Sequence, residues 1–256
     1  MILWCDGAHG AAENMRRDAA LLAAAGRGAE PVLRLFRFEP PGITLGRAQS
    51  PERELDLERC RGAGVSWAVR PTGGRAIYHD QEWTYSLAAP LGDADWGGSL
   101  AEAYERAARL IEASLASLGL PVAIARRAAR GTLAPLARRG VAAPCFASTA
   151  RHEIVIAGRK LVGSAQRRTA TALLQQGSVL LGPAHVRLAE FLAVSEPERA
   201  RLRAALEEAS VHAGTWLGGS PPLTRWAGAL LAALPPGTQR VDGGAGLVLL
   251  SVGSRG

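Results

Sequence analysis

Residues 152–166 read HEIVIAGRKLVGSAQ, and they decide the fold because they predict two strands joined by a tight turn. Residues 152–156 and 160–165 are short runs rich in branched apolar side chains, with Ala157-Gly158 between them. The stretch also holds Lys160, the only lysine among the 30 Lys and Arg residues. Arg is a planar fork that is always charged, whereas Lys is a compact point charge whose pKa shifts readily on burial. Either position 160 requires this compact ammonium, or a single lysine has remained by chance in a chain whose composition has shifted towards arginine. The count alone leaves both interpretations open.

On either side of this hairpin, short apolar runs predict further strands, and longer patterns of helical period predict helices. The expected strands are residues 32–38, 43–45, 65–70, 75–79, 82–87, 121–125, 177–181 and 246–250. The expected helices are residues 10–26, 51–61, 99–118, 196–209 and 223–234, with a loop at 126–141. Hairpins dominate the middle of the chain, which favours an α/β protein of the α+β type, with a mixed, largely antiparallel sheet flanked by helices. We expect one domain over residues 1–256, in which about residues 183–256 form a helical C-terminal extension with a final strand.

The composition favours a cytoplasmic protein. The chain has 256 residues and no apolar run long enough to span a bilayer. Its N-terminus lacks the basic and apolar segments of a signal peptide. Cys5, Cys60 and Cys145 are odd in number and far apart, which fits a reducing compartment better than a disulfide framework.

The net charge of +7 indicates acidic partners: nucleic acid, anionic lipid or an acidic protein. The arginines are scattered and only 5% of residues are aromatic, so no basic and aromatic platform for single-stranded nucleic acid is apparent. An Arg-rich nucleic-acid-binding module is therefore the weaker interpretation, and it would show a steeply salt-dependent affinity. An acidic protein partner is at least as consistent with the charge.

Residues 70–80 read RPTGGRAIYHD and join two predicted strands through a double glycine. Glycines let a ligand approach the backbone closely, and amide N–H groups can line such a turn. A simple hairpin turn accounts for the same residues. His79 follows the turn and is a candidate general base or ligand-contacting group, although a histidine at a strand end can equally be structural.

Cys145 lies beside a proline in the segment PCFAS, residues 144–148, just before the predicted hairpin. A reactive cysteine acts as its thiolate, which a nearby ammonium or imidazolium favours. Antiparallel pairing within the hairpin would bring Lys160 back towards Cys145, where it could stabilise the thiolate and then an oxyanion at the attacked carbonyl. His152 is an alternative partner for the thiol. Cys145 could equally be a small buried side chain, as most single cysteines are.

Together these segments resemble the biotin/lipoate A/B protein ligase family. The resemblance runs through Asn14-Met15, residues 41–49, 70–86 and 145–181, and rests on RPTGGRA-x-x-HD, Tyr85-Ser86 and GRK-x-VGSAQ. It is closest to the cysteine-dependent octanoyltransferases, which are lipoate-protein ligase A-like. This implies a ligase-like catalytic domain. We expect no metal and no cofactor, since no Cys/His spacing indicates a metal site and neither a Walker A nor a Rossmann pattern is present.

The resemblance also implies a set of site residues. Cys145 would be the acyl acceptor and Lys160 its catalytic partner, while the glycine turn and its histidine would line the acyl pocket. The implied substrate-binding residues are Arg70, Thr72, Gly73, Gly74, Arg75, His79, Gly163, Ser164 and Ala165.

The implied reaction moves an octanoyl group from acyl carrier protein, through a thioester on Cys145, to a lysine of a lipoyl domain. The acceptor would be glycine cleavage H protein or the E2 subunit of a 2-oxoacid dehydrogenase. Two other enzymes in this class remain possible: an ATP-dependent lipoate-protein ligase, and an amidotransferase that moves the acyl chain between lipoyl-domain proteins. The ligases have a third glycine where this chain has Arg75, and an Asn-Asp pair where it has residues 151–153. A long side chain at position 75 should obstruct a nucleotide, so acyl transfer is favoured over ligation.

Overall fold

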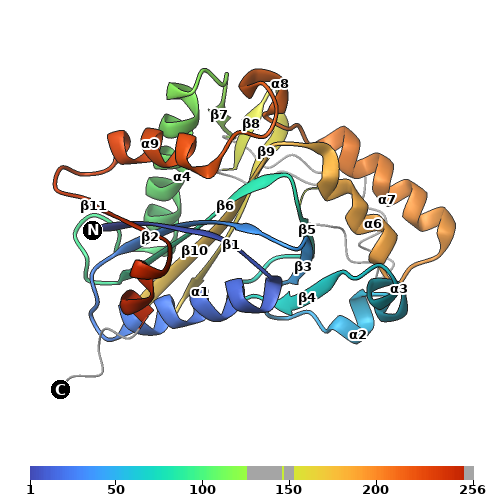
Figure 1. Ribbon diagram of the computed structural model, residues 1–256, viewed down its shortest axis with the longest axis horizontal. Helices are drawn as coiled ribbons and strands as arrows, with labels where there is room; N and C mark the ends of the chain where they lie inside the picture. Colours follow the sequence, from blue (N-terminus) through green and yellow to red (C-terminus); the bar gives the residue numbers. More distant parts are fainter. Residues whose placement is uncertain (126–145, 147–152, 251–256) are drawn as a thin grey trace.

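The computed structural model describes residues 1–125, 146 and 153–250 (Figure 1). The strands are β1 (Ile2–His9), β2 (Val32–Phe38), β3 (Gly42–Leu45), β4 (Ser66–Val69), β5 (Ile77–His79), β6 (Glu82–Pro90), β7 (Ala123–Ile124), β8 (Ile154–Ile156), β9 (Arg159–Arg168), β10 (Ala172–Leu180) and β11 (Gln239–Asp242). The α-helices are α1 (Ala11–Gly26), α2 (Pro51–Glu54), α3 (Leu57–Gly62), α4 (Leu100–Ser117), α6 (Leu188–Phe191), α7 (Glu196–Ala209), α8 (Gly214–Leu217) and α9 (Leu223–Ala233). Among the described residues, the 3₁₀-helices η2 (Pro183–Arg187) and η3 (Gly243–Leu250) are also present.

The described strands form two sheets. The larger has eight strands in the order β11-β1-β2-β6-β10-β9-β8-β7, and the smaller has the order β4-β3-β5. In the larger sheet β1 pairs in parallel with β11 and β2, whereas every pairing from β2 onwards to β7 is antiparallel. The predicted mixed, largely antiparallel sheet is therefore confirmed.

Helices cover both faces of the larger sheet (Figure 1). On one face α4 and α9 pack over a core that includes Leu33, Trp83 and Trp226. On the other face α1 packs against β6 and β10 around Trp4 and Leu174. Apolar residues recur at helical spacing along α1 and α4, so each helix buries one stripe against the sheet, as the sequence predicts.

The hairpin predicted from residues 152–166 is present as β8 and β9. Val155 lies opposite Lys160, and the turn between the strands is Ala157-Gly158. Both turn residues have positive φ, +49° and +78°, as a two-residue type I′ turn requires. Beyond the turn β9 continues to Arg168 and pairs with β10, while β8 pairs on its other side with the two-residue edge strand β7.

Two predictions of local structure are wrong. The helix expected at residues 51–61 is broken into α2 and α3, because Leu55 is buried and forms a bridge with Leu192 while Asp56 caps a new helix by accepting from the Arg59 N–H. The final strand expected at residues 246–250 is part of the 3₁₀-helix η3. In an apolar run this short, the spacing of apolar residues cannot distinguish a helix from a strand.

Two strands lie outside the predicted set. β1 is a central strand of the large sheet, and β11, just before η3, pairs with it in parallel. The predicted C-terminal extension thus contributes a strand to the same sheet as the first residues of the chain. The division into domains stays a prediction.

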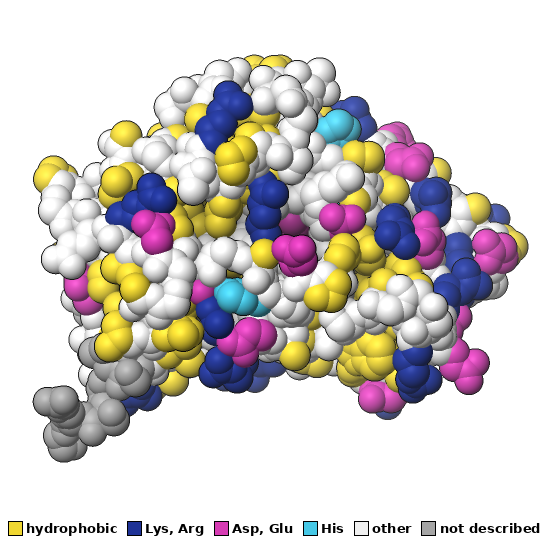
Figure 2. All heavy atoms as spheres, viewed as in Figure 1, with side chains coloured by type: hydrophobic (Ala, Val, Ile, Leu, Met, Phe, Trp, Pro, Cys, Tyr) yellow, Lys and Arg dark blue, Asp and Glu magenta, His cyan; other side chains and the backbone are white. Residues whose placement is uncertain are grey.

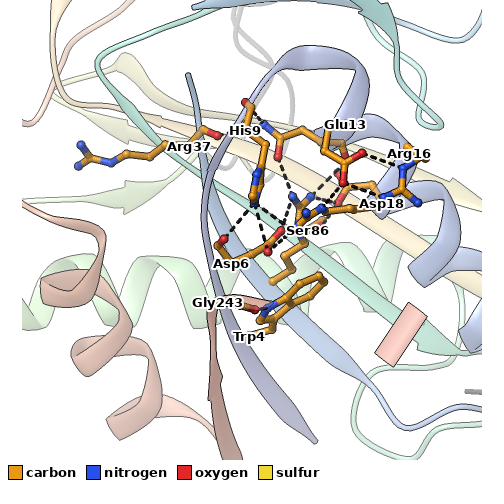
Figure 3. Close-up of polar contacts among 12 residues, drawn as sticks. Trp4, Asp6, His9, Glu13, Arg16, Asp18, Arg37, Ser86 and Gly243 are labelled. Atoms are coloured by element: carbon orange, nitrogen blue, oxygen red, sulfur yellow. Dashed lines mark hydrogen bonds and ion pairs between the residues drawn. The ribbon is translucent and has the colours of Figure 1, made fainter. Parts of the chain in front are cut away.

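A buried charge network fixes α1 to the sheet. The Arg34 guanidinium, fully buried on β2, donates to the carboxylates of Asp6 and Asp18 at 2.7 and 2.6 Å and to the Asn14 side chain at 2.6 Å. Ser86 on β6 also donates to Asp18, at 2.7 Å. Figure 3 shows Asp6, Asp18 and Ser86 converging from three different elements on this space between helix and sheet. The two carboxylates make burial of the guanidinium tolerable, since an unpaired buried charge is very costly.

We predict that Arg34→Ala lowers the free energy of unfolding by about 3–5 kcal/mol, because it leaves the buried Asp18 carboxylate without its cation and Asp6 with Arg17 alone. Arg16→Ala is the matched control, since its pair with Glu13 is largely exposed and should contribute little to stability. Urea unfolding of both variants measures the difference. Similar small losses in the two proteins would contradict the role assigned to Arg34.

Candidate active site

A cavity lies where the smaller sheet meets β6, β9 and β10. Its volume is about 20 Å³, which is room for about one water molecule. Any longer ligand therefore needs lining side chains to move, and the unbranched Met15 is suited to that. The lining residues are Met15, Phe38, Thr44, Arg70, Ile77, His79, Thr84, Gly163, Ser164, Ala165, Gln176, Gly177 and Ser178.

Five of the predicted substrate-binding residues line this cavity: Arg70, His79, Gly163, Ser164 and Ala165. They come from three separate stretches of the sequence, and β5, β9 and the turn after β4 bring them together. The other predicted residues, Thr72, Gly73, Gly74 and Arg75, belong to the adjacent turn and are not among the lining residues. Their assignment as substrate-binding residues stays a prediction.

His79 is held on both ring nitrogens. Nδ1 lies 2.6 Å from Glu82 Oε1 and Nε2 lies 2.6 Å from Thr44 Oγ1, while the ring stacks on Phe38 with centroids 3.9 Å apart. His79 and Glu82 are both buried. With both nitrogens engaged, the imidazole is fixed as a wall of the cavity, and this favours a contact role over that of a general base.

Arg70 organises the glycine turn through its guanidinium. Nη2 donates to the backbone oxygens of Gly73 and Arg75 at 2.7 and 2.8 Å, and Nη1 donates to the Thr44 oxygen at 3.2 Å. The buried guanidinium thus donates to carbonyl oxygens of both the turn and β3, and it ties the two segments together. The compact ammonium of a lysine lacks the planar fork that makes these contacts.

The turn is fixed a second time through Thr72. Its hydroxyl donates to Gln176 Oε1 at 2.6 Å, and Gln176 Nε2 donates to Asp18 at 2.5 Å. Asp18 also accepts from Arg34, so a continuous chain of buried hydrogen bonds runs from the charge network under α1 to the glycine turn. Gln176 itself lines the cavity. The position of the turn therefore depends on residues far away in the sequence.

Lys160 is only 1% exposed, and its ammonium contacts the carboxylate of Glu153 at 2.5 Å. The Phe146 ring lies 5.0 Å from Lys160 Nζ, in the range of a cation–π contact. The carboxylate offsets the cost of burying the ammonium. A fixed, desolvated positive charge of this kind can stabilise an anion much more strongly than the same charge in water.

Gly163 makes room for this arrangement. A Cβ at position 163 would lie 2.9 Å from the Phe146 ring and 3.1 Å from the Lys160 Cε. The missing side chain lets the ring and the lysine stem occupy the same face of β9. The packing of Lys160 therefore depends on Gly163, three residues later in the same motif.

The model of the lipoyl protein ligase A/B catalytic domain family matches residues 10–217 of the chain, which include the cavity and the hairpin. The chain belongs to this family. The matched region also contains Cys145 and Lys160, and it ends at α8.

Curated relatives place the chain among the octanoyltransferases of the family. Octanoyltransferase LipM of Kyrpidia tusciae is 37% identical over 211 residues, which cover 80% of this chain and 75% of the relative. Octanoyltransferase LipM of Moorella thermoacetica is 40% identical over 169 residues, or 66% of this chain and 60% of that protein. This lipoyl protein ligase A/B catalytic domain is accordingly an acyltransferase, of the octanoyltransferase type.

Solved structures share the fold of this lipoyl protein ligase A/B catalytic domain. A chain from the lipoylation system of Thermoplasma acidophilum, a bi-partite lipoate protein ligase and its E2 lipoyl domain, superimposes with a TM-score of 0.71 at 20% identity and covers 98% of this chain and 90% of that one. A lipoate-protein ligase A bound with ATP gives a TM-score of 0.69, also at 20% identity, covering 98% and 92% of the two chains. At this identity the likeness shows the fold alone, and it confirms the predicted ligase-like catalytic fold.

Cys145 and His152 lie outside the described residues, as does the loop predicted at 126–141. The two other cysteines of this family member are described and lie in its core. Burial raises the pKa of the Cys5 thiol to about 11, and burial also raises the pKa of Cys60. Neither forms a thiolate readily, which leaves Cys145 as the candidate nucleophile.

Glu153, Gln176 and Thr44 are among the site residues that sequence reasoning missed. Glu153 had a usable signal, because it is a carboxylate directly before the apolar strand β8 and two residues before Val155, which pairs with Lys160. Side chains two residues apart share a face of a strand, so the acid and the lysine belong on one side of the hairpin. Gln176 and Thr44 carry no comparable local signal.

No helix in residues 1–125 and 153–250 is long and apolar enough to cross a bilayer.

Proposed function

We propose that this octanoyltransferase takes an octanoyl group from acyl carrier protein, holds it as a thioester on Cys145, and passes it to a lysine of a lipoyl-domain protein. The observation that carries the proposal is the buried Lys160 ammonium, in contact with Glu153 and with the ring of Phe146. Phe146 is the residue bonded to Cys145 in the chain. A cysteine next to such a residue, in a relative of the octanoyltransferases, supports covalent acyl transfer.

In the first step the Cys145 thiolate attacks the carbonyl carbon of the donor thioester. The new C–S bond forms, the carrier's C–S bond breaks, and the carrier sulfur leaves and takes up a proton. The positive charge of Lys160 favours the thiolate beforehand and the tetrahedral oxyanion during attack. Exchange of one thioester for another is nearly balanced in energy, so the enzyme supplies positioning and charge stabilisation rather than driving force.

In the second step the neutral amine of the acceptor lysine attacks the Cys145 thioester. A C–N bond forms, the C–S bond breaks, the nitrogen loses a proton, and the Cys145 thiolate returns. The product is an amide, and no nucleotide takes part. The cavity walls formed by Met15, Phe38 and Ile77 offer the apolar contacts that an octanoyl chain needs once it opens the space between them.

We predict that Cys145→Ala forms no acyl-enzyme and loses transfer from octanoyl-acyl carrier protein to a lipoyl domain. Intact-protein mass spectrometry checks the first result and octanoylation of the acceptor lysine checks the second. Two further reactions of the unaltered enzyme complete the test: free octanoate with ATP, and an octanoylated lipoyl domain as donor. A mass shift that survives Cys145→Ala would overturn the nucleophile, and faster transfer with either alternative donor would overturn acyl carrier protein as the donor.

We predict that Lys160→Arg lowers kcat by about 10²-fold or more, the size expected when one stabilising donor of a transition state is lost. Arg keeps the charge, but its larger planar head does not fit between Glu153 and the Phe146 ring. Arg159→Lys is the matched control, because Arg159 is the exposed preceding residue and its guanidinium donates to backbone oxygens of α7. Steady-state rates and melting temperatures of both variants decide the matter, and normal turnover by Lys160→Arg would make the lone lysine incidental.

A further inference from the structure

Two exposed arginines follow glycines whose backbones are in contact at the turn beside the cavity. A Cβ at Gly46 would lie 2.0 Å from the Gly74 oxygen, so the backbones at these two glycines are in direct contact. The residue after each glycine is an exposed arginine, Arg47 and Arg75. The Arg47 N–H also donates to the Thr72 oxygen at 2.9 Å. The position of both arginines is thus fixed by the glycine turn.

A third arginine reaches the same turn from the large sheet. Arg167, on β9, directs its guanidinium at the Pro71 oxygen, with 3.4 Å between Nη1 and that oxygen. Residue 165, two positions earlier on β9, lines the cavity and lies beside Gly74. Arg47, Arg75 and Arg167 therefore cluster around the glycine turn, beside the part of β9 that lines the cavity, and are called here the arginine rim.

No carboxylate among the described residues forms an ion pair with any of the three. Glu52, an acid close to Arg47 in the sequence, accepts from the Ser50 hydroxyl instead. Three cations around one turn without paired acids raise the local positive potential, which attracts and orients an anionic partner.

The other arginine-rich surface, along α6 and α7, is different. There Arg187 and Arg203 both pair with Glu190, and Arg199 pairs with Asp56. Figure 2 shows basic and acidic side chains interspersed over the part of the molecule where Figure 1 places α7. Charges of both signs cancel at a distance, so this surface offers little attraction to an acidic protein.

We propose that the arginine rim is the docking surface for the acidic carrier protein that delivers the acyl group. The inference rests on the proposed function and adds the place where the donor protein binds. A carrier that presents acidic side chains around its acylated arm would meet the three arginines while the arm enters the cavity beside β9. Complementary charges of this kind act mainly on the rate and orientation of encounter. The net charge of +7 of the whole chain assists the approach without specifying the contact.

The test compares two donors in the double variant Arg47→Glu with Arg167→Glu. One donor is octanoyl-acyl carrier protein, and the other is octanoyl-pantetheine, which has neither protein nor phosphate. We expect kcat/KM for the carrier protein to fall about 10-fold or more, the range of electrostatic steering. We expect a much smaller fall for octanoyl-pantetheine, so the ratio of the two constants drops. Raising the salt concentration should lower the wild-type ratio in the same direction.

The matched control is Arg27→Glu with Arg201→Glu, which makes the same change in net charge on two exposed arginines elsewhere. Arg27 follows the end of α1, about 18 Å along the helix from Met15, and Arg201 is on α7. An equal fall of the ratio in both double variants would overturn the arginine rim, as would an unchanged ratio in the rim variant. Arg47→Gln with Arg167→Gln repeats the test with a milder change. Failure of the wild-type enzyme to use the carrier protein at all would instead overturn the proposed function.

Discussion

The burial of Arg34 between Asp6 and Asp18 is the constraint on which the rest of the site depends. It joins β1, β2 and α1, and Asp18 extends it through Gln176 to Thr72 of the glycine turn. Every member of such a buried chain must be satisfied, because an unpaired polar group in the interior costs far more than one hydrogen bond contributes. The turn beside the cavity therefore has one position, set by charges that do not line the cavity.

The β8–β9 hairpin also buries a charged group together with the partner that satisfies it. Lys160 is buried with Glu153 and closed off by the Phe146 ring, and Gly163 leaves the space that this packing needs. Replacing such a pair with apolar residues often stabilises a protein, so stability alone does not account for it. A desolvated ammonium is worth keeping where negative charge develops on a thiolate or an oxyanion. The two buried charge clusters thus differ: the first fixes a backbone, and the second is the one that we propose stabilises the reacting groups.

The sequence predicts the local structure well wherever its signals are local. The hairpin at residues 152–166, α1 and α4 follow from alternation, helical period and capping residues, and the family motifs identify the ligase-like fold. The break at Leu55 depends on a bridge to Leu192, and β11 depends on pairing with the first strand of the chain. Contacts between residues so far apart leave no periodic pattern in either segment, which is why these features were not predictable.

The residues of the site also divide into those that the sequence identifies and those that it does not. Arg70, His79 and residues 163–165 could be named from motifs and do line one cavity. The contact of Gln176 with Thr72 spans 104 positions, and nothing near either residue indicates it. Cys145, on which the chemistry is proposed to depend, lies outside the described residues, so its role rests on sequence, on its neighbour Phe146 and on the family.

The most direct measurement is a chase from the isolated acyl-enzyme. The enzyme is charged with octanoyl-acyl carrier protein, freed of donor, and mixed with a lipoyl domain in the absence of ATP. The account predicts that the octanoyl group leaves Cys145 and appears on the acceptor lysine at a rate no slower than steady-state turnover. An adduct on another residue, or an adduct on Cys145 that does not pass to the acceptor, would contradict it.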